Sequence, residues 1–223
     1  MKTRKFFTVM AVCLGMFISP VAAEEVEEES PFSVGVDVYS SYIWRGTKLG
    51  GAAIQPSLSY SIGGFSAGVW GSVGFTGDAA EIDPYISYEL PFGLSLGLTD
   101  YYYCGDFTET SDTAGSHALE INAAYGIKGF SIKANYILNE AGGAGSAGGD
   151  TYFEVGYAFK NFDVFVGAGS GWHTSDTEFA LCNIGLGTSK EIKITDSFSL
   201  PVSGQIVVNP ELKKFYLTVG ISL

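Results

Sequence analysis

A histidine and a serine stand two residues apart at His173 and Ser175, with the carboxylates of Asp176 and Glu178 close behind. An imidazole can deprotonate a serine hydroxyl, and a neighbouring carboxylate can orient the imidazole for that step. Together the four residues could support acyl transfer or hydrolysis. Two alternate residues of these types also meet often by chance, so the pair alone does not establish catalysis.

A larger group of charged and aromatic side chains shares the polar parity along the chain. It comprises Trp70, Glu81, Asp83, Tyr85, Glu89, Glu120, Lys133, Glu154 and Asp163, and Arg45 adds a cation at the mouth of the first long connection. Acids outnumber bases in this group, so a water-filled passage lined by it would enrich cations and repel anions. Alternatively, the charges only solvate an interior or pair with one another, and Arg45 could equally lie at a rim.

The remaining reactive residues give little support for a cofactor, a metal or a nucleic-acid partner. His117 has no ligand partner close in sequence, and the glycines between 142 and 149 lack the strand-to-helix context of a phosphate loop. The formal net charge of −12 makes a phosphate backbone an unfavourable partner, because nucleic-acid binding depends on basic patches. We therefore predict no cofactor, no metal site and no nucleic-acid binding.

The elements that must position these side chains have the period of strands. In residues 52–75 one face is apolar along its full length, and the other carries mainly small or polar side chains and glycine. Gly63-Gly64 turns the chain between the two halves, which predicts a hairpin. The second face could not build a dry core, so the apolar face must meet an oily phase that the protein does not supply.

The same alternation continues along the chain and predicts about 12 strands of about ten residues, long enough to cross a bilayer when tilted. They fall at residues 32–38, 54–62, 65–75, 82–90, 94–98, 119–127, 130–138, 153–159, 162–168, 184–194, 200–208 and 215–223. Tight connections alternate with longer polar ones, as in barrels with short periplasmic turns and long external loops. We expect an all-β fold, a transmembrane antiparallel up-and-down β-barrel over residues 32–223, with both termini in the periplasm.

The two ends of the chain and a few irregular positions complete the expected organisation. Residues 1–23 combine a basic start, an apolar segment and small residues, which predicts a cleaved secretory signal, and residues 24–31 form an acidic leader that we expect to be disordered. Leu181 and Ile184 are out of phase, which predicts a bulge near Cys182-Asn183. Asp100 and Lys190 fall on the apolar parity and are expected near a rim or a register change.

Several motifs resemble the TorF family, whose members are classed as porins. They are Tyr42-Ile43-Trp44-Arg45-Gly46, Ile54-Gln55-Pro56, Ala67-Gly68-Val69-Trp70-Gly71-Ser72, Glu81-Ile82-Asp83 and, further on, Tyr152-Phe153-Glu154. The resemblance implies an outer-membrane barrel and a pore, without naming a solute. Separately, His173 and Ser175 resemble the His-x-Ser dyad of outer-membrane phospholipases and lipid A deacylases. The parity of residues 162–168 places the pair on the other face or in a loop, away from lipid.

The sequence thus predicts an integral protein of the bacterial outer membrane that acts as a channel for passive diffusion of small solutes, with a mild preference for cations. The main alternative is a non-conducting structural or adhesive barrel, and a lipid hydrolase using His173 and Ser175 is less favoured. The expected partners are outer-membrane lipid, the barrel-assembly machinery that recognises alternating apolar residues before Leu223, and small solutes. The oligomeric state stays open.

Overall fold

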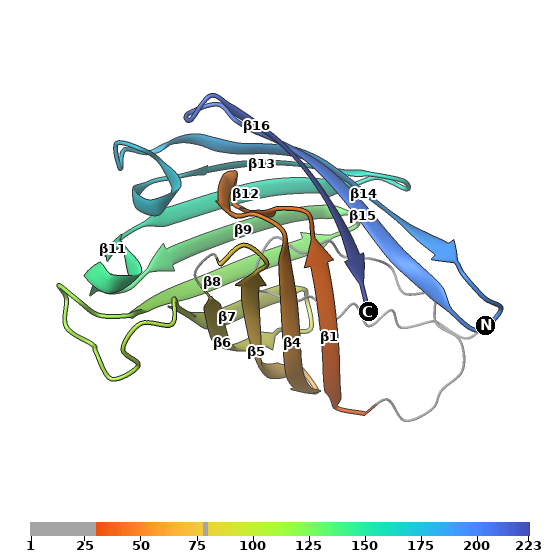
Figure 1. Cartoon of the computed structure of the whole chain (residues 1–223), viewed down its shortest axis with the longest axis horizontal. Helices are drawn as coiled ribbons and strands as arrows, with labels where there is room; N and C mark the ends of the chain where they lie inside the picture. The colour runs from red at the N-terminus through yellow and green to blue at the C-terminus, as the bar shows by residue number, and fades with distance from the viewer. Residues whose placement is uncertain (1–29, 78–79) are drawn as a thin grey trace.

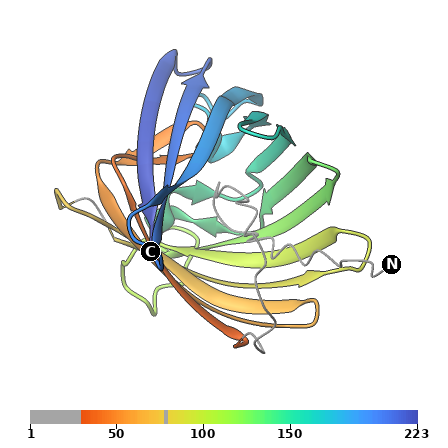
Figure 2. The same cartoon turned by 90° about the vertical axis from the view of Figure 1, so that its right-hand side faces the viewer.

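The computed structural model describes residues 30–77 and 80–223, in which twelve long antiparallel strands form one closed barrel. The barrel strands are β1 (Phe32–Tyr39), β4 (Ala53–Ile62), β5 (Phe65–Gly74), β6 (Glu81–Glu89), β7 (Leu94–Tyr102), β8 (His117–Ile127), β9 (Phe130–Ile137), β12 (Thr151–Ala158), β13 (Asp163–Gly169), β14 (Ala180–Lys193), β15 (Ser199–Asn209) and β16 (Lys214–Ser222). Figures 1 and 2 show the wall from two directions. The predicted fold and strand number are confirmed, whereas the signal at 1–23 and residues 24–29 of the leader lie outside the described residues.

The barrel closes where its first strand meets its last. Asp37, Val38 and Tyr39 of β1 pair with Ser222, Ile221 and Gly220 of β16. The backbone of Val36 also exchanges hydrogen bonds of 3.1 and 2.9 Å with Leu223, the last residue. Closure gives every long strand two neighbours, so the wall has no free edge to pair with another chain.

The long connections all lie at one end of the barrel, as the sequence predicts. β4 and β5, β6 and β7, β8 and β9, β12 and β13, and β14 and β15 are joined by short turns, which lie at the same end as the start of β1 and the end of β16. At the opposite end the connections carry β2 (Tyr42–Trp44), β3 (Thr47–Gly50), β10 (Glu140–Ala141), η1 (Gly142–Ala144), β11 (Ser146–Ala147) and η2 (Gly171–His173). Among the described residues, no helix is long and apolar enough to cross a membrane.

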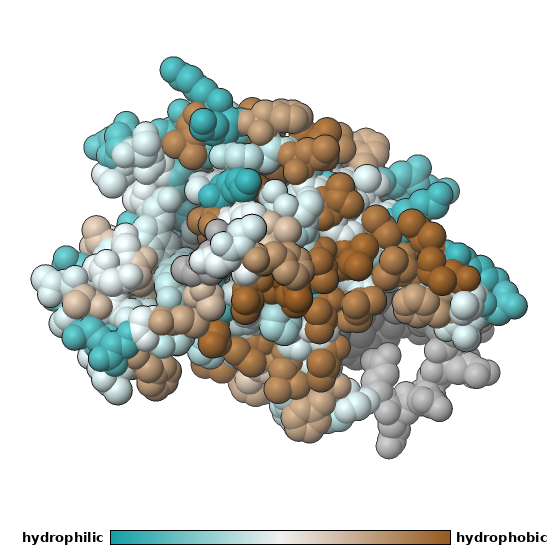
Figure 3. Space-filling view, viewed as in Figure 1, coloured by the Kyte–Doolittle hydropathy of each residue, from teal (hydrophilic) through white to brown (hydrophobic). Residues whose placement is uncertain are grey.

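The outer face of the barrel is apolar and the inner face is not. Alternate residues of β4 such as Ile54, Leu58 and Ile62 are 38%, 48% and 61% exposed, and most other strands present similar side chains outward. In Figure 3 hydrophobic residues gather over the strands that face the viewer, and hydrophilic ones are more frequent toward the two ends. The inner face buries polar side chains instead, including Gln55, Glu120 and Asn135. An apolar belt of this kind fits the hydrocarbon layer of a bilayer.

Two of the irregular positions in the sequence have a clear structural origin. Gly167 pairs with Asn183 and Ala168 with Leu181, so Cys182 is the extra residue of a β-bulge, as predicted. Lys190 lies on the exposed part of β14 next to the short turn to β15, which places it at a rim.

Inward aromatic rings are accommodated by glycines on the neighbouring strands. The rings of Tyr39, Tyr85, Tyr152 and Phe165 occupy the space that a Cβ would need at Gly220, Gly68, Gly167 and Gly185, respectively. A side chain at any of these glycines would therefore displace an aromatic ring. The glycines let large rings lie flat against the wall of a narrow barrel.

Candidate functional site

The first long connection folds into the barrel instead of extending from it. Its strands β2 and β3 form a hairpin whose two turn residues, Arg45 and Gly46, have φ of 46° and 86°. Positive φ at both positions is the geometry of a two-residue hairpin turn. Tyr42 and Trp44 are 8% and 5% exposed, so the hairpin is packed on its inner side. We call residues 40–52 the inner loop.

Contacts with distant strands hold the inner loop in place. The side-chain amide of Asn209, on β15, donates a 3.0 Å hydrogen bond to the carbonyl of Gly46. The hydroxyl of Thr218, on β16, donates a 2.9 Å hydrogen bond to the carbonyl of Ser41. A Cβ at Gly46 would also collide with the carbonyl oxygen of Cys182, the bulged residue of β14. The hairpin tip therefore requires glycine at this position.

Arg45 places its charge inside the barrel and not at the rim. Its two terminal nitrogens donate to the two carboxylate oxygens of Glu120 at 2.6 and 2.7 Å. Tyr101 and Asn122 donate to the same carboxylate at 2.9 and 2.6 Å. Glu120 is 1% exposed and the Arg45 side chain 12%, so this is a buried, bidentate ion pair with additional donors.

Aromatic side chains surround this ion pair. The guanidinium carbon of Arg45 lies 4.6 Å from the ring centres of both Trp44 and Tyr152, a cation–π distance. The rings of Trp44, Tyr101 and Trp172 contact one another at centroid distances of 5.4 to 6.0 Å. The outer half of the barrel thus has a packed aromatic core, although the sequence predicted charges facing water.

A second ion pair lies on the adjoining wall. Lys133 donates to Glu154 at 2.8 Å, and the other oxygen of Glu154 accepts from Tyr152 at 2.6 Å and from Asn183 at 3.2 Å. The Lys133 side chain is 34% exposed, so this ion pair is more exposed to solvent than the pair of Arg45 with Glu120. Glu120, Lys133 and Glu154 are therefore paired with one another or with Arg45. This agrees with the alternative in which the interior charges pair with one another.

Glu81 and Asp83 form a separate acidic group near the outer end of β6. They are 3% and 0% exposed, so both carboxylates are buried. Trp70 lies beside Asp83 on the paired strand and is 3% exposed. These acids face inward, but protein surrounds them, whereas the sequence led us to expect a hydrated lumen.

The remaining predicted lining residues lie nearer the short-turn end. Tyr85, Glu89 and Asp163 are half-buried, and the ring of Tyr85 lies against Gly68. The structure joins Arg45 to Glu120 and Lys133 to Glu154, and it places Glu81 beside Asp83. That these ten residues line a pore stays a prediction.

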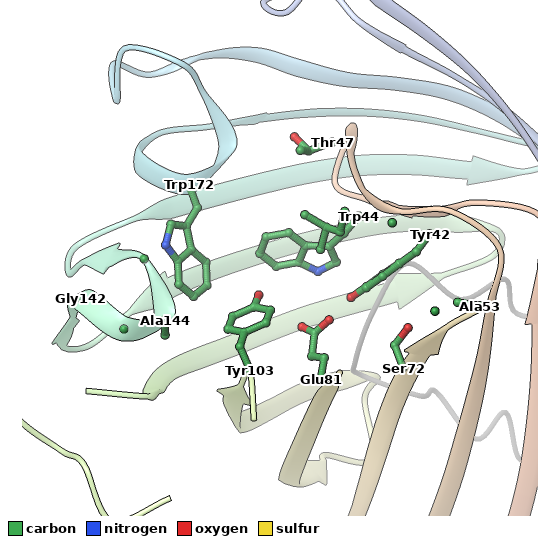
Figure 4. A pocket seen from close by; sticks show the side chains of 15 residues that line it. Tyr42, Trp44, Thr47, Ala53, Ser72, Glu81, Tyr103, Gly142, Ala144 and Trp172 are labelled. Atoms are coloured by element: carbon green, nitrogen blue, oxygen red, sulfur yellow. The ribbon is translucent and has the colours of Figure 1, made fainter. Parts of the chain in front are cut away.

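A cavity of about 470 Å³ opens beside Glu81 at the end with the long connections. Its walls include the rings of Tyr42, Trp44, Tyr103 and Trp172, together with the backbone of residues 142–145. Figure 4 shows the hydroxyls of Tyr42 and Tyr103 and the indole nitrogen of Trp44 directed toward the Glu81 carboxylate. The site combines one carboxylate, several ring faces and few other charges.

His173 and Ser175 are not arranged as a catalytic pair. The ring of His173 is 2% exposed and packs 5.1 Å from both Trp44 and Tyr152, with its Nε2 unpartnered. Burial, reinforced by the charge of Arg45, lowers the pKa of His173 to about 2, so the ring is neutral. The Ser175 hydroxyl is on the exposed surface and donates to Glu211. Asp176 instead accepts from the backbone of Glu178.

His117 and the cysteines have structural surroundings. His117 bonds to Asp100 at 2.8 Å and to the carbonyl of Phe107 at 3.0 Å, which ties the long connection after β7 to the barrel rim. Cys104 and Cys182 are free thiols. Within residues 30–77 and 80–223, no three His, Cys, Asp or Glu side chains gather where they could hold a metal ion.

Alternation along the strands does not predict the aromatic residues of the site. Tyr42, Trp44, Tyr103 and Trp172 lie in connections or just past a strand end, where alternation along strands carries no information. One signal was available, because Tyr42 and Trp44 alternate with Ile43 inside the first connection. Such a pattern within a loop indicates a short buried hairpin.

Comparisons with known proteins give a family and distant structural similarities. A family model described as "Bacterial protein of unknown function (Gcw_chp)" matches residues 24–198. No curated protein matches the chain. One mutant of Rh. blastica porin is 16% identical with a TM-score of 0.40, over 77% of this chain and 55% of the porin chain. A triple mutant of Rhodopseudomonas blastica porin is 16% identical with a TM-score of 0.40, over 82% and 61%. The chain therefore covers little more than half the length of these porins.

Proposed function

This chain belongs to the Gcw_chp family of bacterial proteins, and we propose that it is an outer-membrane channel for passive diffusion of small solutes, narrowed by its inner loop. The observation that carries the proposal is the closed barrel with an apolar outer face and a polar, charged inner face. A barrel of this kind pairs every strand, meets lipid outside and can pass polar solutes inside. The expectation of a pore from the TorF resemblance agrees with this proposal.

We infer a membrane location from the free energy that the apolar outer face would cost in water. Phe32, Val34 and Leu217 are 62%, 75% and 63% exposed on the outer face, and similar side chains surround the barrel. An aqueous location would leave this belt in contact with water, at about 25 cal/mol for each Å² of apolar surface. Outer-membrane lipid is therefore the proposed partner of the belt, and the barrel-assembly machinery the proposed route into the membrane.

The inner loop is the proposed constriction. It crosses to β8, β15 and β16 and places Arg45 and Glu120 face to face in the interior. A mild preference for cations is proposed from Glu81 and Asp83, which have no basic ion-pair partner among the described residues, whereas Glu120 and Glu154 do. A fixed negative charge in a low-dielectric passage raises the local concentration of cations.

One observation favours a second candidate, a barrel that does not conduct. The inner loop packs its aromatic rings against the wall, and four donors satisfy Glu120. A loop held this firmly could close the interior permanently. In that case the protein would be a structural or binding barrel, and the cavity beside Glu81 would be its binding site.

Planar-bilayer recording in a salt gradient tests the proposal and separates the two candidates. The refolded mature protein should give discrete conductance steps and a reversal potential of the sign set by cation flow. Arg45→Ala should raise the conductance because it frees the constriction. Replacing Glu81 by Gln together with Asp83 by Asn should move the reversal potential toward zero.

Glu191→Gln provides a charge-matched control, since Glu191 is exposed near a short turn of β14. It should leave both quantities unchanged. Anion selectivity would refute the preference for cations. If neither the wild-type protein nor Arg45→Ala conducts, although heat-modifiable migration shows that both are folded, the result would favour the non-conducting barrel.

A further inference from the structure

The aromatic cavity at the outer end of the barrel has the features of a binding site for a small cation. Its volume of about 470 Å³ lies in the range of small-ligand pockets, about 300 to 1,000 Å³. Its lining contributes four aromatic rings from three separate connections, which the inner loop and residues 142–145 bring together. We propose that this cavity binds a small organic cation with a methylated ammonium group, held by Glu81 and the rings of Tyr42, Trp44, Tyr103 and Trp172.

The charge of the cavity indicates a cationic ligand. Glu81 lines the cavity and Asp83 lies next to it on the inward face of β6. Arg45, which follows Trp44 in the inner loop, is already paired with Glu120 through two hydrogen bonds. Within the described structure, neither Glu81 nor Asp83 has an ion-pair partner, so ionisation of either carboxylate creates an uncompensated negative charge that a bound cation would balance.

A polar atom of the wall supplies independent evidence for a ligand. Trp44 is 5% exposed, and its indole nitrogen is buried without a hydrogen-bond partner in the described structure. Figure 4 shows this nitrogen directed into the cavity, toward Glu81. Buried polar atoms without partners are uncommon and costly, and a bound molecule would relieve that cost.

The ring faces favour a methylated ammonium over a metal ion. Aromatic faces attract cations through their quadrupole, and cages of such rings recognise quaternary ammonium groups. A metal ion would need several oxygen, nitrogen or sulfur ligands, and no such group gathers in the described residues. A single carboxylate beside several rings instead fits a diffuse, bulky charge.

The test uses choline and its neutral isostere 3,3-dimethyl-1-butanol as a matched pair of probes. Both are titrated into the refolded full barrel in detergent micelles, with calorimetry and tryptophan fluorescence as readouts, since Trp44 and Trp172 line the cavity. Choline should bind saturably and at least about tenfold more tightly than the neutral probe. Equal affinity for the two probes, or no saturable binding of choline, would overturn the proposal.

Two variants and a control locate the binding. Glu81→Gln and Trp172→Leu should each weaken choline binding by about tenfold or more. Glu191→Gln removes a carboxylate of the same type from the exposed end of β14 and should bind as the wild type does. Heat-modifiable migration verifies that each variant is folded. Unchanged choline affinity in folded Glu81→Gln would contradict the assignment.

A cation site here rests on the proposed channel function and adds a solute class to it, yet binding does not require conduction. If the barrel binds choline but does not conduct, the binding-site proposal holds and the channel proposal is refuted. If the barrel conducts but does not bind choline, the channel proposal holds and the binding-site proposal is refuted. Titration and bilayer recording therefore give separable results.

Discussion

Removing the guanidinium of Arg45 should destabilise the barrel strongly, because it leaves the Glu120 carboxylate buried without its counter-charge. Glu120 is 1% exposed and receives two of its four hydrogen bonds from Arg45. Breaking a buried ion pair by deleting one partner costs about 3 to 5 kcal/mol. We therefore expect Arg45→Ala to lower the free energy of unfolding by about that amount. The loss cannot exceed the free energy of releasing the inner loop, because release would expose the Glu120 carboxylate to water.

Lys133→Ala is the internal comparison. Lys133 is 34% exposed beside Glu154, so water screens this pair and its loss should cost about 1 kcal/mol or less. Arg45→Met combined with Glu120→Gln removes both charges and keeps an acceptor for Tyr101. This double variant should recover most of the stability lost in Arg45→Ala, since it leaves no charge unpaired.

Guanidinium unfolding and refolding in lipid vesicles, followed by tryptophan fluorescence, measures these differences as shifts of the midpoint at constant slope. Hydrogen exchange at the amides of the inner loop reports whether the loop detaches before the wall unfolds. A free energy of unfolding of Arg45→Ala within about 1 kcal/mol of the wild type, or a larger loss in Lys133→Ala than in Arg45→Ala, would contradict the expected cost of leaving Glu120 unpaired.

Further predictions concern the histidine, the glycines, the serine and the location. Below pH 6.5 the unfolded chain protonates His173 and the folded barrel does not, so His173 should contribute a loss of stability as the pH falls, about 2 kcal/mol at pH 5. Equilibrium unfolding of His173→Gln beside the wild type should show this contribution as the difference between the two pH profiles. Gly185→Ala should cost about 1 to 3 kcal/mol in the same assay because its Cβ meets the ring of Phe165, whereas Gly204→Ala, with open space around it, should be nearly neutral. Purified protein in mixed micelles should release no acyl chains from phospholipid or lipid A, and hydrolysis abolished by Ser175→Ala would contradict this. The mature protein should fractionate with the outer membrane and migrate heat-modifiably, and recovery as a detergent-free periplasmic monomer would refute the membrane assignment.

The wall of the barrel could be predicted from the sequence because its physical signal is local. A strand with lipid on one side and a polar interior on the other must alternate, so Ile54, Leu58 and Ile62 mark their strand without knowledge of its neighbours. The bulge at Cys182 could be predicted for the same reason, because one extra residue reverses the alternation.

The arrangement of the interior could not be predicted in the same way. Alternation places Glu120 on the inner face, but it does not reveal that Arg45, 75 residues away, folds back to meet it. Likewise, the contact between the Tyr152 ring and Gly167 depends on the register between β12 and β13. Odd or even position in a strand predicts whether a side chain points into or out of the barrel. Which side chains it contacts across the barrel depends on how the barrel closes and on the path of the inner loop.

The inner loop also constrains the order in which the molecule can fold. It lies between the first two barrel strands, yet its contacts join residues separated by 75, 163 and 177 positions in sequence. Contacts of such long range form slowly, because chain entropy must be lost before they contribute any stability. The hairpin therefore cannot complete its docking until β14, β15 and β16 have come round to face it, and by its position it must be enclosed as the seam between β1 and β16 closes. Sealing of the wall and docking of the loop thus become one cooperative event, in which late strands secure an early segment.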